Sequence, residues 1–232
     1  MKLNNIKCII ILAVFIVSCQ VEDQPISTES SLRVLHASPN VSGIHVDYFQ
    51  QEINLATNPA LFYQENIRFT LPANEDRNVL VIPSNDTLSI AYQKSVNFRR
   101  GESHTLALTG NVDSIEGILF KDELLKITDS IVGVRFINLA SNIGSISVGT
   151  SGGSSNIVES INFGEASVFN EVTATQASGS YLFQFKDTNN NVLASTFLNP
   201  LPPFGIKPIF KNFTYALVGN SGNLSVVKID HF

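Results

Sequence analysis

The stretch Arg33-Val-Leu-His-Ala-Ser-Pro-Asn-Val-Ser-Gly-Ile-His-Val46 decides the fold, because the chain contains it twice. It aligns with Arg135-Phe-Ile-Asn-Leu-Ala-Ser-Asn-Ile-Gly-Ser-Ile-Ser-Val148, with Arg, Asn and Val in common and the apolar positions kept. Near the end of each half, Thr105-Leu-Ala-Leu-Thr-Gly-Asn111 aligns with Thr214-Tyr-Ala-Leu-Val-Gly-Asn220 at five of seven positions. Self-similarity of this kind predicts two copies of one structural unit.

Each copy has the pattern of short β-strands. Apolar residues alternate with polar ones in short runs, and clusters of Gly, Asn and Ser separate the runs every 8–12 residues. Strands are expected over Leu88–Tyr92, where Leu88, Ile90 and Tyr92 alternate, and over Ile118–Lys121, which aligns with Val227–Asp230. Glu116–Ile127 is the best helix candidate, although that alignment favours a strand. We therefore expect an all-β chain of two tandem immunoglobulin-like or Greek-key β-sandwiches, repeat 1 over residues 32–128 and repeat 2 over residues 132–232.

The N-terminus resembles the signal peptide of a bacterial lipoprotein. Lys2 and Lys7 precede an apolar run that is too short to span a bilayer, and Ile16-Val-Ser-Cys19 resembles a lipobox. This resemblance implies that residues 1–18 are a signal peptide and that Cys19 is lipidated. Residues 19–31 are polar and acidic, which is typical of a flexible tether. Glu22-Asp23 resembles the surface-export signal of Bacteroidetes-type lipoproteins, or else is part of a plain solvated linker. The expected location is the bacterial outer membrane, with the protein lipid-anchored at the cell surface or on the periplasmic face.

Composition excludes several function classes. Without residues 1–18, 13 basic residues stand against 20 acidic ones, a net charge near −7. Such a chain lacks the basic patch that nucleic acid requires. Cys8 and Cys19 are its two cysteines, so the folded part has neither a disulfide framework nor thiolate chemistry.

The two repeats resemble the family of domains of unknown function numbered 4397. The resemblance rests on Arg33–Pro39 and on Arg100-Gly-Glu-Ser-His-Thr-Leu-Ala-Leu-Thr-Gly110, with Phe163–Phe169 and Phe213–Gly219 as counterparts in repeat 2. Asn138 and Ser141 stand where the family motif has His and Pro. The resemblance implies a β-sandwich in secreted or surface proteins, and it supplies no catalytic residues.

His36, Ser38 and Asp47 are the one close grouping of a base, a nucleophile and a carboxylate in repeat 1. A triad needs Ser–His and His–Asp hydrogen bonds and an oxyanion hole beside the serine. No strained turn of the Gly-x-Ser-x-Gly kind presents Ser38, and serine with proline is ordinary chemistry at the end of a strand. We expect these residues to be structural. No catalytic, cofactor-binding or metal site is predicted.

The histidines and one Asp-Asn loop are candidate metal ligands. The four histidines lack metal-ligand spacing, and His45 is expected on the solvent-facing side of its strand. Asp187-Thr-Asn-Asn-Asn191 begins like a calcium loop but has Val192 where such a loop requires glycine. A hairpin turn is the preferred interpretation.

Asp86-Thr87-Leu88, Asp113-Ser114-Ile115 and Asp129-Ser130-Ile131 resemble the O-glycosylation acceptor of Bacteroidetes-type envelope proteins. Thr87, Ser114 and Ser130 are therefore candidate sites, although Asp-Ser and Asp-Thr also cap turns. Phe49, Phe62-Tyr63 and Pro202-Pro-Phe204 are candidate exposed aromatics for glycan binding.

The sequence thus predicts a non-catalytic cell-envelope lipoprotein, a surface interaction or structural module whose partner is a protein or a glycan. The alternatives are a hydrolase-type enzyme using His36 and Ser38, or an accessory subunit of a polysaccharide-uptake system.

Overall fold

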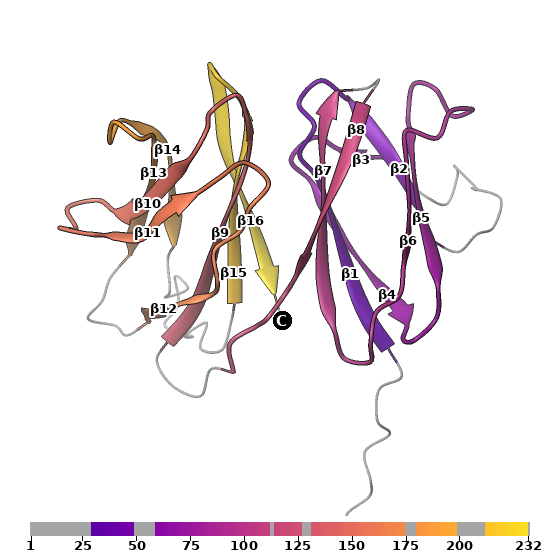
Figure 1. The fold of residues 1–232 in the computed structure, drawn as a ribbon, viewed down its shortest axis with the longest axis horizontal. Coiled ribbons are helices and arrows are strands. Elements are labelled where there is room, and N and C mark those ends of the chain that lie inside the picture. The colour runs from indigo at the N-terminus through magenta and orange to yellow at the C-terminus, as the bar shows by residue number, and fades with distance from the viewer. Residues whose placement is uncertain are drawn as a thin grey trace, which may run out of the picture.

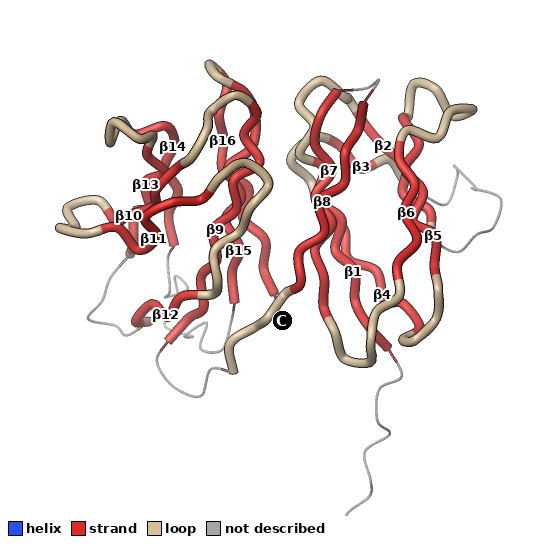
Figure 2. The backbone as a smooth tube through the Cα atoms, in the orientation of Figure 1, coloured by secondary structure: helices blue, strands red, loops and turns tan. Residues whose placement is uncertain are grey.

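The computed structural model describes residues 29–48, 59–111, 114–126, 131–174, 180–198 and 212–231. These residues form sixteen β-strands in four sheets of four, and they contain no helix. Two sheets face each other in each half, so the expectation of an all-β chain with two sandwiches is confirmed (Figures 1 and 2). No described segment forms a helix long and apolar enough to cross a membrane.

The first sandwich consists of the strands β1 (Glu29–His36), β2 (Gly43–Asp47), β3 (Leu61–Phe62), β4 (Asn66–Pro72), β5 (Arg77–Pro83), β6 (Tyr92–Val96), β7 (Ser103–Asn111) and β8 (Ser114–Lys121). Its sheets have the orders β4-β1-β7-β8 and β3-β2-β5-β6. All pairs are antiparallel except β1 with β7, which is parallel.

The second sandwich consists of β9 (Ile131–Ser141), β10 (Ile146–Thr150), β11 (Asn156–Ile161), β12 (Asn170–Thr173), β13 (Tyr181–Lys186), β14 (Val192–Leu198), β15 (Asn212–Asn220) and β16 (Asn223–His231). Its sheet orders, β12-β9-β15-β16 and β11-β10-β13-β14, are those of the first sandwich with eight added to every strand number. The register repeats as well: Leu32 pairs with His104 in the first sandwich, and Val134 pairs with Phe213 in the second. The sequence repeat is therefore a repeat of topology and register.

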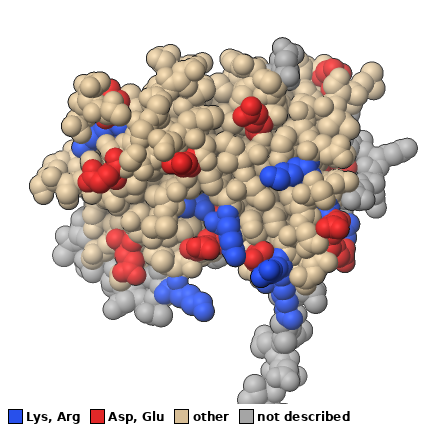
Figure 3. All heavy atoms as spheres, viewed as in Figure 1, with Lys and Arg blue, Asp and Glu red and all other residues tan. Residues whose placement is uncertain are grey.

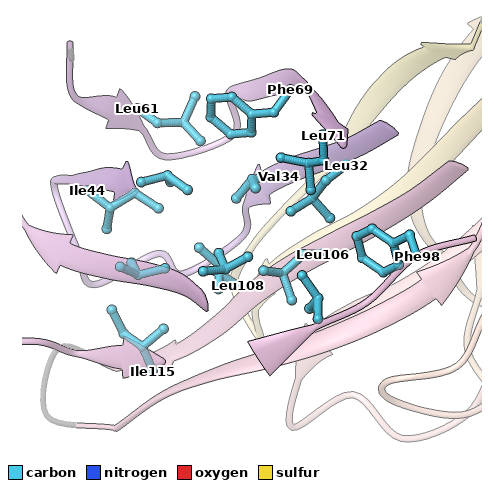
Figure 4. Packing of buried hydrophobic residues seen from close by; sticks show 14 of the residues in the cluster. Leu32, Val34, Ile44, Leu61, Phe69, Leu71, Phe98, Leu106, Leu108 and Ile115 are labelled. Atoms are coloured by element: carbon cyan, nitrogen blue, oxygen red, sulfur yellow. The ribbon is translucent and has the colours of Figure 1, made fainter. Parts of the chain in front are cut away.

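Each sandwich has its own apolar core between its two sheets. In the first, Leu32, Val34, Ile44 and Leu106 are fully buried and point toward one another across the gap between the sheets (Figure 4). The second core is built around Phe136, which makes edge-on ring contacts with Phe183 and Phe185. Fully burying one such side chain contributes about 1.5–3 kcal/mol, which replaces the stabilisation that disulfides give to smaller secreted domains.

A third apolar cluster joins the two sandwiches. It packs the outer face of the β1–β7–β8 region against the outer face of β9, β15 and β16, which lie side by side in Figure 1. Its buried members are Leu35, Ala37, Ala107, Ile137, Leu139, Ala216, Val218, Val227 and Ile229. Strands β9 and β15 are consequently buried on both faces along nearly their whole length.

Two local expectations were wrong, and the strand that the repeat alignment favoured over a helix at Glu116–Ile127 was right for the part that lies in β8. β1 begins at Glu29, inside the expected tether, because Ser30 and Ser31 are buried and bond to Leu71 O and Ser103 Oγ. The strand expected from Leu88 begins only at Tyr92; Leu88 is 97% exposed in the loop before it. The helix candidate Glu116–Ile127 is not a helix: its first part lies in β8, paired with β7, as the repeat alignment favoured.

Candidate functional site

The junction between the sandwiches is pseudo-symmetric. Arg33 and Arg135 occupy equivalent positions in β1 and β9, and Lys121 and Asp230 occupy equivalent positions in β8 and β16. Arg33 Nη2 donates to Asp230 O (2.9 Å), and Arg135 Nη1 donates to Lys121 O (3.2 Å). Each repeat thus contributes one arginine to a backbone carbonyl of the other, as in an interface between two identical subunits.

The Arg135 side of the junction is a closed ionic network. Arg135 is 2% exposed, and its Nη2 donates to Asp122 Oδ1 at 2.6 Å. Thr105 Oγ1 donates to the same carboxylate at 3.0 Å, and Arg135 Nε donates to Thr214 Oγ1 at 3.1 Å. Burial lowers the pKa of Arg135, while the Asp122 charge raises it. Charges buried in this way are stable only because each is paired and hydrogen-bonded.

His231 completes this network as a neutral ring. Its Nε2 lies 2.8 Å from Thr214 Oγ1, and its Nδ1 lies 3.8 Å from Asp122 Oδ2. Phe169 covers it with an edge-on ring contact at 5.7 Å and also lies 4.8 Å from the guanidinium carbon of Arg135. Burial lowers the pKa of His231 to about 4, so the ring is uncharged at neutral pH.

The Arg33 side is open, and among the described residues Arg33 makes no salt bridge to a carboxylate, although Glu29 and Glu102 line the same cavity. Arg33 is half-buried, and its hydrogen-bond acceptors among the described residues are neutral: Asn66 Oδ1 at 2.6 Å and Asp230 O at 2.9 Å. The position equivalent to Asp122 is His231, and Arg68 stands directly opposite Arg33 on β4. Burial and then the Arg68 charge lower the pKa of Arg33, while the charges of Asp122 and Asp230 raise it.

A cavity of about 260 Å³ opens at this side of the junction. Arg33 and Arg68 line it together with the ends of β1 and β7, the linker residue Leu124 and His231. It lies at the end of the molecule where β1 begins and β16 ends (Figure 1). Figure 3 shows positive and negative side chains mixed over the visible face, with several of both signs in its lower half.

The pair His36 and Ser38 does not form a catalytic arrangement. Both residues are fully buried; Ser38 Oγ donates to Gly110 O at 2.5 Å, and Ser38 N–H donates to His36 Nδ1 at 3.3 Å. Burial lowers the pKa of His36 to about 4. The serine hydroxyl is therefore committed to a backbone carbonyl of β7.

Asn138 performs the role of His36 in the second sandwich. Its Oδ1 accepts from Ala140 N–H at 3.2 Å, two residues on, as His36 Nδ1 accepts from Ser38 N–H. Asn138 Nδ2 donates to Gly144 O and Ile161 O, which fixes the following turn. An amide that cannot act as an acid or base thus serves the same structural purpose.

Comparison with known proteins identifies the family. The family model described as a domain of unknown function, DUF4397, matches residues 30–149, which extend from β1 to β10. The chain belongs to the DUF4397 family. No curated protein matches it.

Solved structures with partial likeness to this DUF4397 chain are β-proteins of low identity. A putative cell adhesion protein from Bacteroides uniformis has 8% identity and a TM-score of 0.27, with 88% of this chain and 99% of that chain covered. A family-26 carbohydrate-binding module from Eubacterium rectale, in complex with maltoheptaose, has 10% identity and a TM-score of 0.30, with 87% and 97% covered. A streptococcal virulence factor described as binding α-glucan has 10% identity and a TM-score of 0.27, with 85% and 95% covered. Likeness at these TM-scores carries no argument about function.

The candidate modification sites fall in different places. Thr87 is exposed in the β5–β6 loop, where Asp86 Oδ1 accepts from Leu88 N–H. Ser114 is exposed at the first position of β8. Cys19 and Ser130 lie outside the described residues of this DUF4397 chain, as do the signal peptide and most of the tether.

The structure also shows where the calcium-loop candidate, His45 and the candidate exposed aromatics lie. Asp187–Asn191 is the turn of the β13–β14 hairpin, and Asn191 donates to both carboxylate oxygens of Asp187, so the hairpin interpretation is confirmed.

His45 is 8% exposed, which contradicts its expected solvent-facing position; β2 is flanked by both β3 and β5. Phe62 is 55% exposed and lines an apolar cavity of about 600 Å³ with Leu61 and Phe69. Phe49 and Pro202–Phe204 lie outside the described residues.

Sequence reasoning missed the junction network. The alignment had paired Arg33 with Arg135 and Thr105 with Thr214 without assigning them a role. One available signal was the near-continuous apolar run Val132–Ala140. A strand that is covered on one face alone alternates apolar and polar residues, so this run indicates a strand that is buried on both faces. An arginine in the middle of a strand buried on both faces then requires an acid partner.

Proposed function

We propose that this chain is a non-catalytic, lipid-anchored protein of the bacterial outer envelope, whose two fused sandwiches form one rigid binding module. The single observation that carries the proposal is the equivalence of His36 and Asn138. The pair His36 and Ser38, which has catalytic residue types, serves a backbone role that an asparagine fills in the other repeat.

The anchor follows from the sequence of the first nineteen residues. Lipidation of Cys19 holds the chain at the membrane, because acyl chains contribute about 0.8 kcal/mol for each buried CH₂ group. β1 begins at Glu29, ten residues after Cys19, so the tether spans at most about 36 Å. The module then works close to the outer membrane surface, and exposure to the outside of the cell is part of the proposal.

The partner is a protein or a glycan, engaged by loops and sheet edges. Leu88 is 97% exposed and Ile90 is 56% exposed, both in the β5–β6 loop. This loop lies at the opposite end of the first sandwich from the start of β1, and so points away from the anchor (Figure 1). Exposed large apolar side chains grouped in one loop favour an interaction surface.

An enzyme screen tests the non-catalytic part. Wild-type protein, His36→Asn and Ser38→Ala are incubated with chromogenic esters, glycosides and peptides, and folding is checked by circular dichroism. We expect no turnover with any of the three. Turnover by the wild type that folded His36→Asn loses would overturn the proposal in favour of the hydrolase alternative.

Two further experiments test the location and the binding surface. Protease treatment of intact cells should remove the protein, whereas protection until the outer membrane is opened would place it on the periplasmic face. Cross-linking on cells should capture a partner that the double variant Leu88→Ser, Ile90→Ser loses. Val192→Ser, which changes a 50% exposed residue of β14, is the matched control and should keep the partner.

A further inference from the structure

The two halves of the junction differ in one chemical respect. Arg135 meets the carboxylate of Asp122, and Phe169 lies over its guanidinium. At the equivalent places around Arg33 stand neutral His231 and the cation Arg68. Among the described residues neither Arg33 nor Arg68 makes an ion pair with a carboxylate.

This arrangement has an energetic cost. Like charges directly opposite on adjacent strands repel each other, and Arg33 is partly withdrawn from solvent. Arg33 has five N–H donors, of which the described contacts use one to Asn66 and one to Asp230 O. An anion between the two guanidinium groups would remove the repulsion and accept the remaining donors.

We infer that the cavity at Arg33 and Arg68 binds the carboxylate group of a small ligand. The second repeat supplies the template, because a carboxylate is the group that the equivalent arginine holds there. Planar carboxylate and guanidinium groups form paired hydrogen bonds. The cavity, at about 260 Å³, has room for a group of this size and for one sugar ring or short chain that carries it.

The surrounding side chains favour an anion with polar neighbours. Thr70 lines the same cavity and adds a hydroxyl group. Ser30, Ser31 and Ser103 also line it, but their hydroxyls donate to Leu71 O, Ser103 Oγ and Asp122 Oδ2. Glu102, which also lines it, is engaged by Lys121 at 3.1 Å and by Arg99 N–H, and its pKa is lowered by these contacts. Glu29 is exposed at the start of β1. The site therefore selects a compact acid over an extended polyanion.

The inference rests on the proposed function, since it names a ligand class for one surface of the binding module. The probe is D-glucuronate, added in the tens of millimolar range to full-length protein in a non-ionic detergent. The readout is the NMR signals of the arginine Nε–H groups. Glucose is the neutral control, and inorganic phosphate is the competing anion.

Glucuronate should shift the signals of Arg33 and Arg68, and glucose should not. Arg68→Gln, which changes an exposed residue and leaves the junction contacts in place, should weaken binding about tenfold. Arg33→Gln should abolish it. Lys94→Gln removes one positive charge from β6 in the other sheet and should leave binding unchanged.

Three results would overturn the inference: no shift at either arginine, equal binding by Arg68→Gln and wild type, or tighter binding of phosphate than of glucuronate. Because Arg68→Gln does not touch the core, a folding failure of Arg33→Gln leaves the test intact. None of these results bears on the enzyme screen or on the cross-linking at Leu88, so failure of this site and failure of the proposed function are distinguishable.

Discussion

Arg33 and Arg135 each donate a hydrogen bond to a backbone carbonyl of the opposite sandwich, Arg33 to Asp230 and Arg135 to Lys121. The two acceptors occupy equivalent positions in β16 and β8, so the repeats meet as the halves of a symmetric dimer do. Of these two arginines, Arg135 alone forms a salt bridge with an acid among the described residues, and the Asp122 carboxylate lies with it in the buried centre of the junction. The two sides of the interface therefore differ in charge pairing while sharing the arginine-to-carbonyl contact.

Asp122→Ala should be the most destabilising single change at the junction. It leaves Arg135 buried without its counter-ion, and breaking a buried pair in this way costs about 3–5 kcal/mol. Urea denaturation followed by circular dichroism measures the change in the free energy of unfolding. Glu75→Ala, which breaks the exposed pair with Arg77, is the control and should cost less than about 1 kcal/mol. Equal effects of the two substitutions would mean that the buried pair contributes no more than a surface pair.

Stability should fall as the pH drops from about 6.5 to about 4. In this range His36 and His231 take up protons in the unfolded chain but not in the folded one, because burial lowers each folded pKa to about 4. The unfolded state then binds more protons, so acid favours unfolding, by about 3 kcal/mol for each fully buried histidine. Urea midpoints measured at pH 7 and pH 4.5 test this expectation.

His36→Asn should make that pH profile shallower. An asparagine at position 36 keeps a side-chain acceptor for Ser38 N–H, as Asn138 does for Ala140 N–H, and its side chain does not titrate. At pH 7 the variant should stay folded, with its stability within about 1.5 kcal/mol of the wild type. An unchanged acid dependence would place the titration on other groups.

Gly110→Ala and Gly219→Ala should both be strongly destabilising. Each glycine has a positive φ, 95° and 109°, and an added Cβ would lie 2.2 Å from a carbonyl oxygen, of Ser114 and Asn223 respectively. Gly144→Ala is the control: φ is 77° but nothing lies within 4 Å, so it should cost about 1 kcal/mol. Thermal denaturation should rank Gly110→Ala and Gly219→Ala well below the control; equal melting temperatures would show that the backbone shifts without cost.

Mass spectrometry of protein from its native cells should find a sugar on Thr87 or Ser114, both of which are exposed, or on Ser130. Thr188 follows Asp187 but precedes Asn189, an amide in place of an apolar residue, and should be unmodified. If all three sites are unmodified, the Asp-Thr and Asp-Ser pairs serve only as turn caps. Asp86 already makes contacts of this kind, because its carboxylate accepts from Leu88 N–H and Ser89 Oγ.

The strands and their repetition could be predicted from local patterns. The alternation of apolar and polar residues and the positions of turn-forming residues depend on a single strand or hairpin. Leu88 shows the limit: alternation with Ile90 and Tyr92 suggested a strand, but no partner strand pairs with Leu88, and the residues before Tyr92 form a loop. The carboxylate site depends on a comparison between Asp122 and His231, at the ends of two hairpins in different repeats. Their roles become visible only when β9 is seen packed against β1 and β7.

We conclude that the two repeats form one rigid unit through Arg33, Arg135 and the apolar cluster around Ile137. Differential scanning calorimetry of the full-length protein tests it most directly. A single transition, with equal calorimetric and van't Hoff enthalpies, is the predicted result, and Asp122→Ala should lower its midpoint or split it. Two separate transitions in the wild-type protein would contradict the claim, because the sandwiches would then unfold independently.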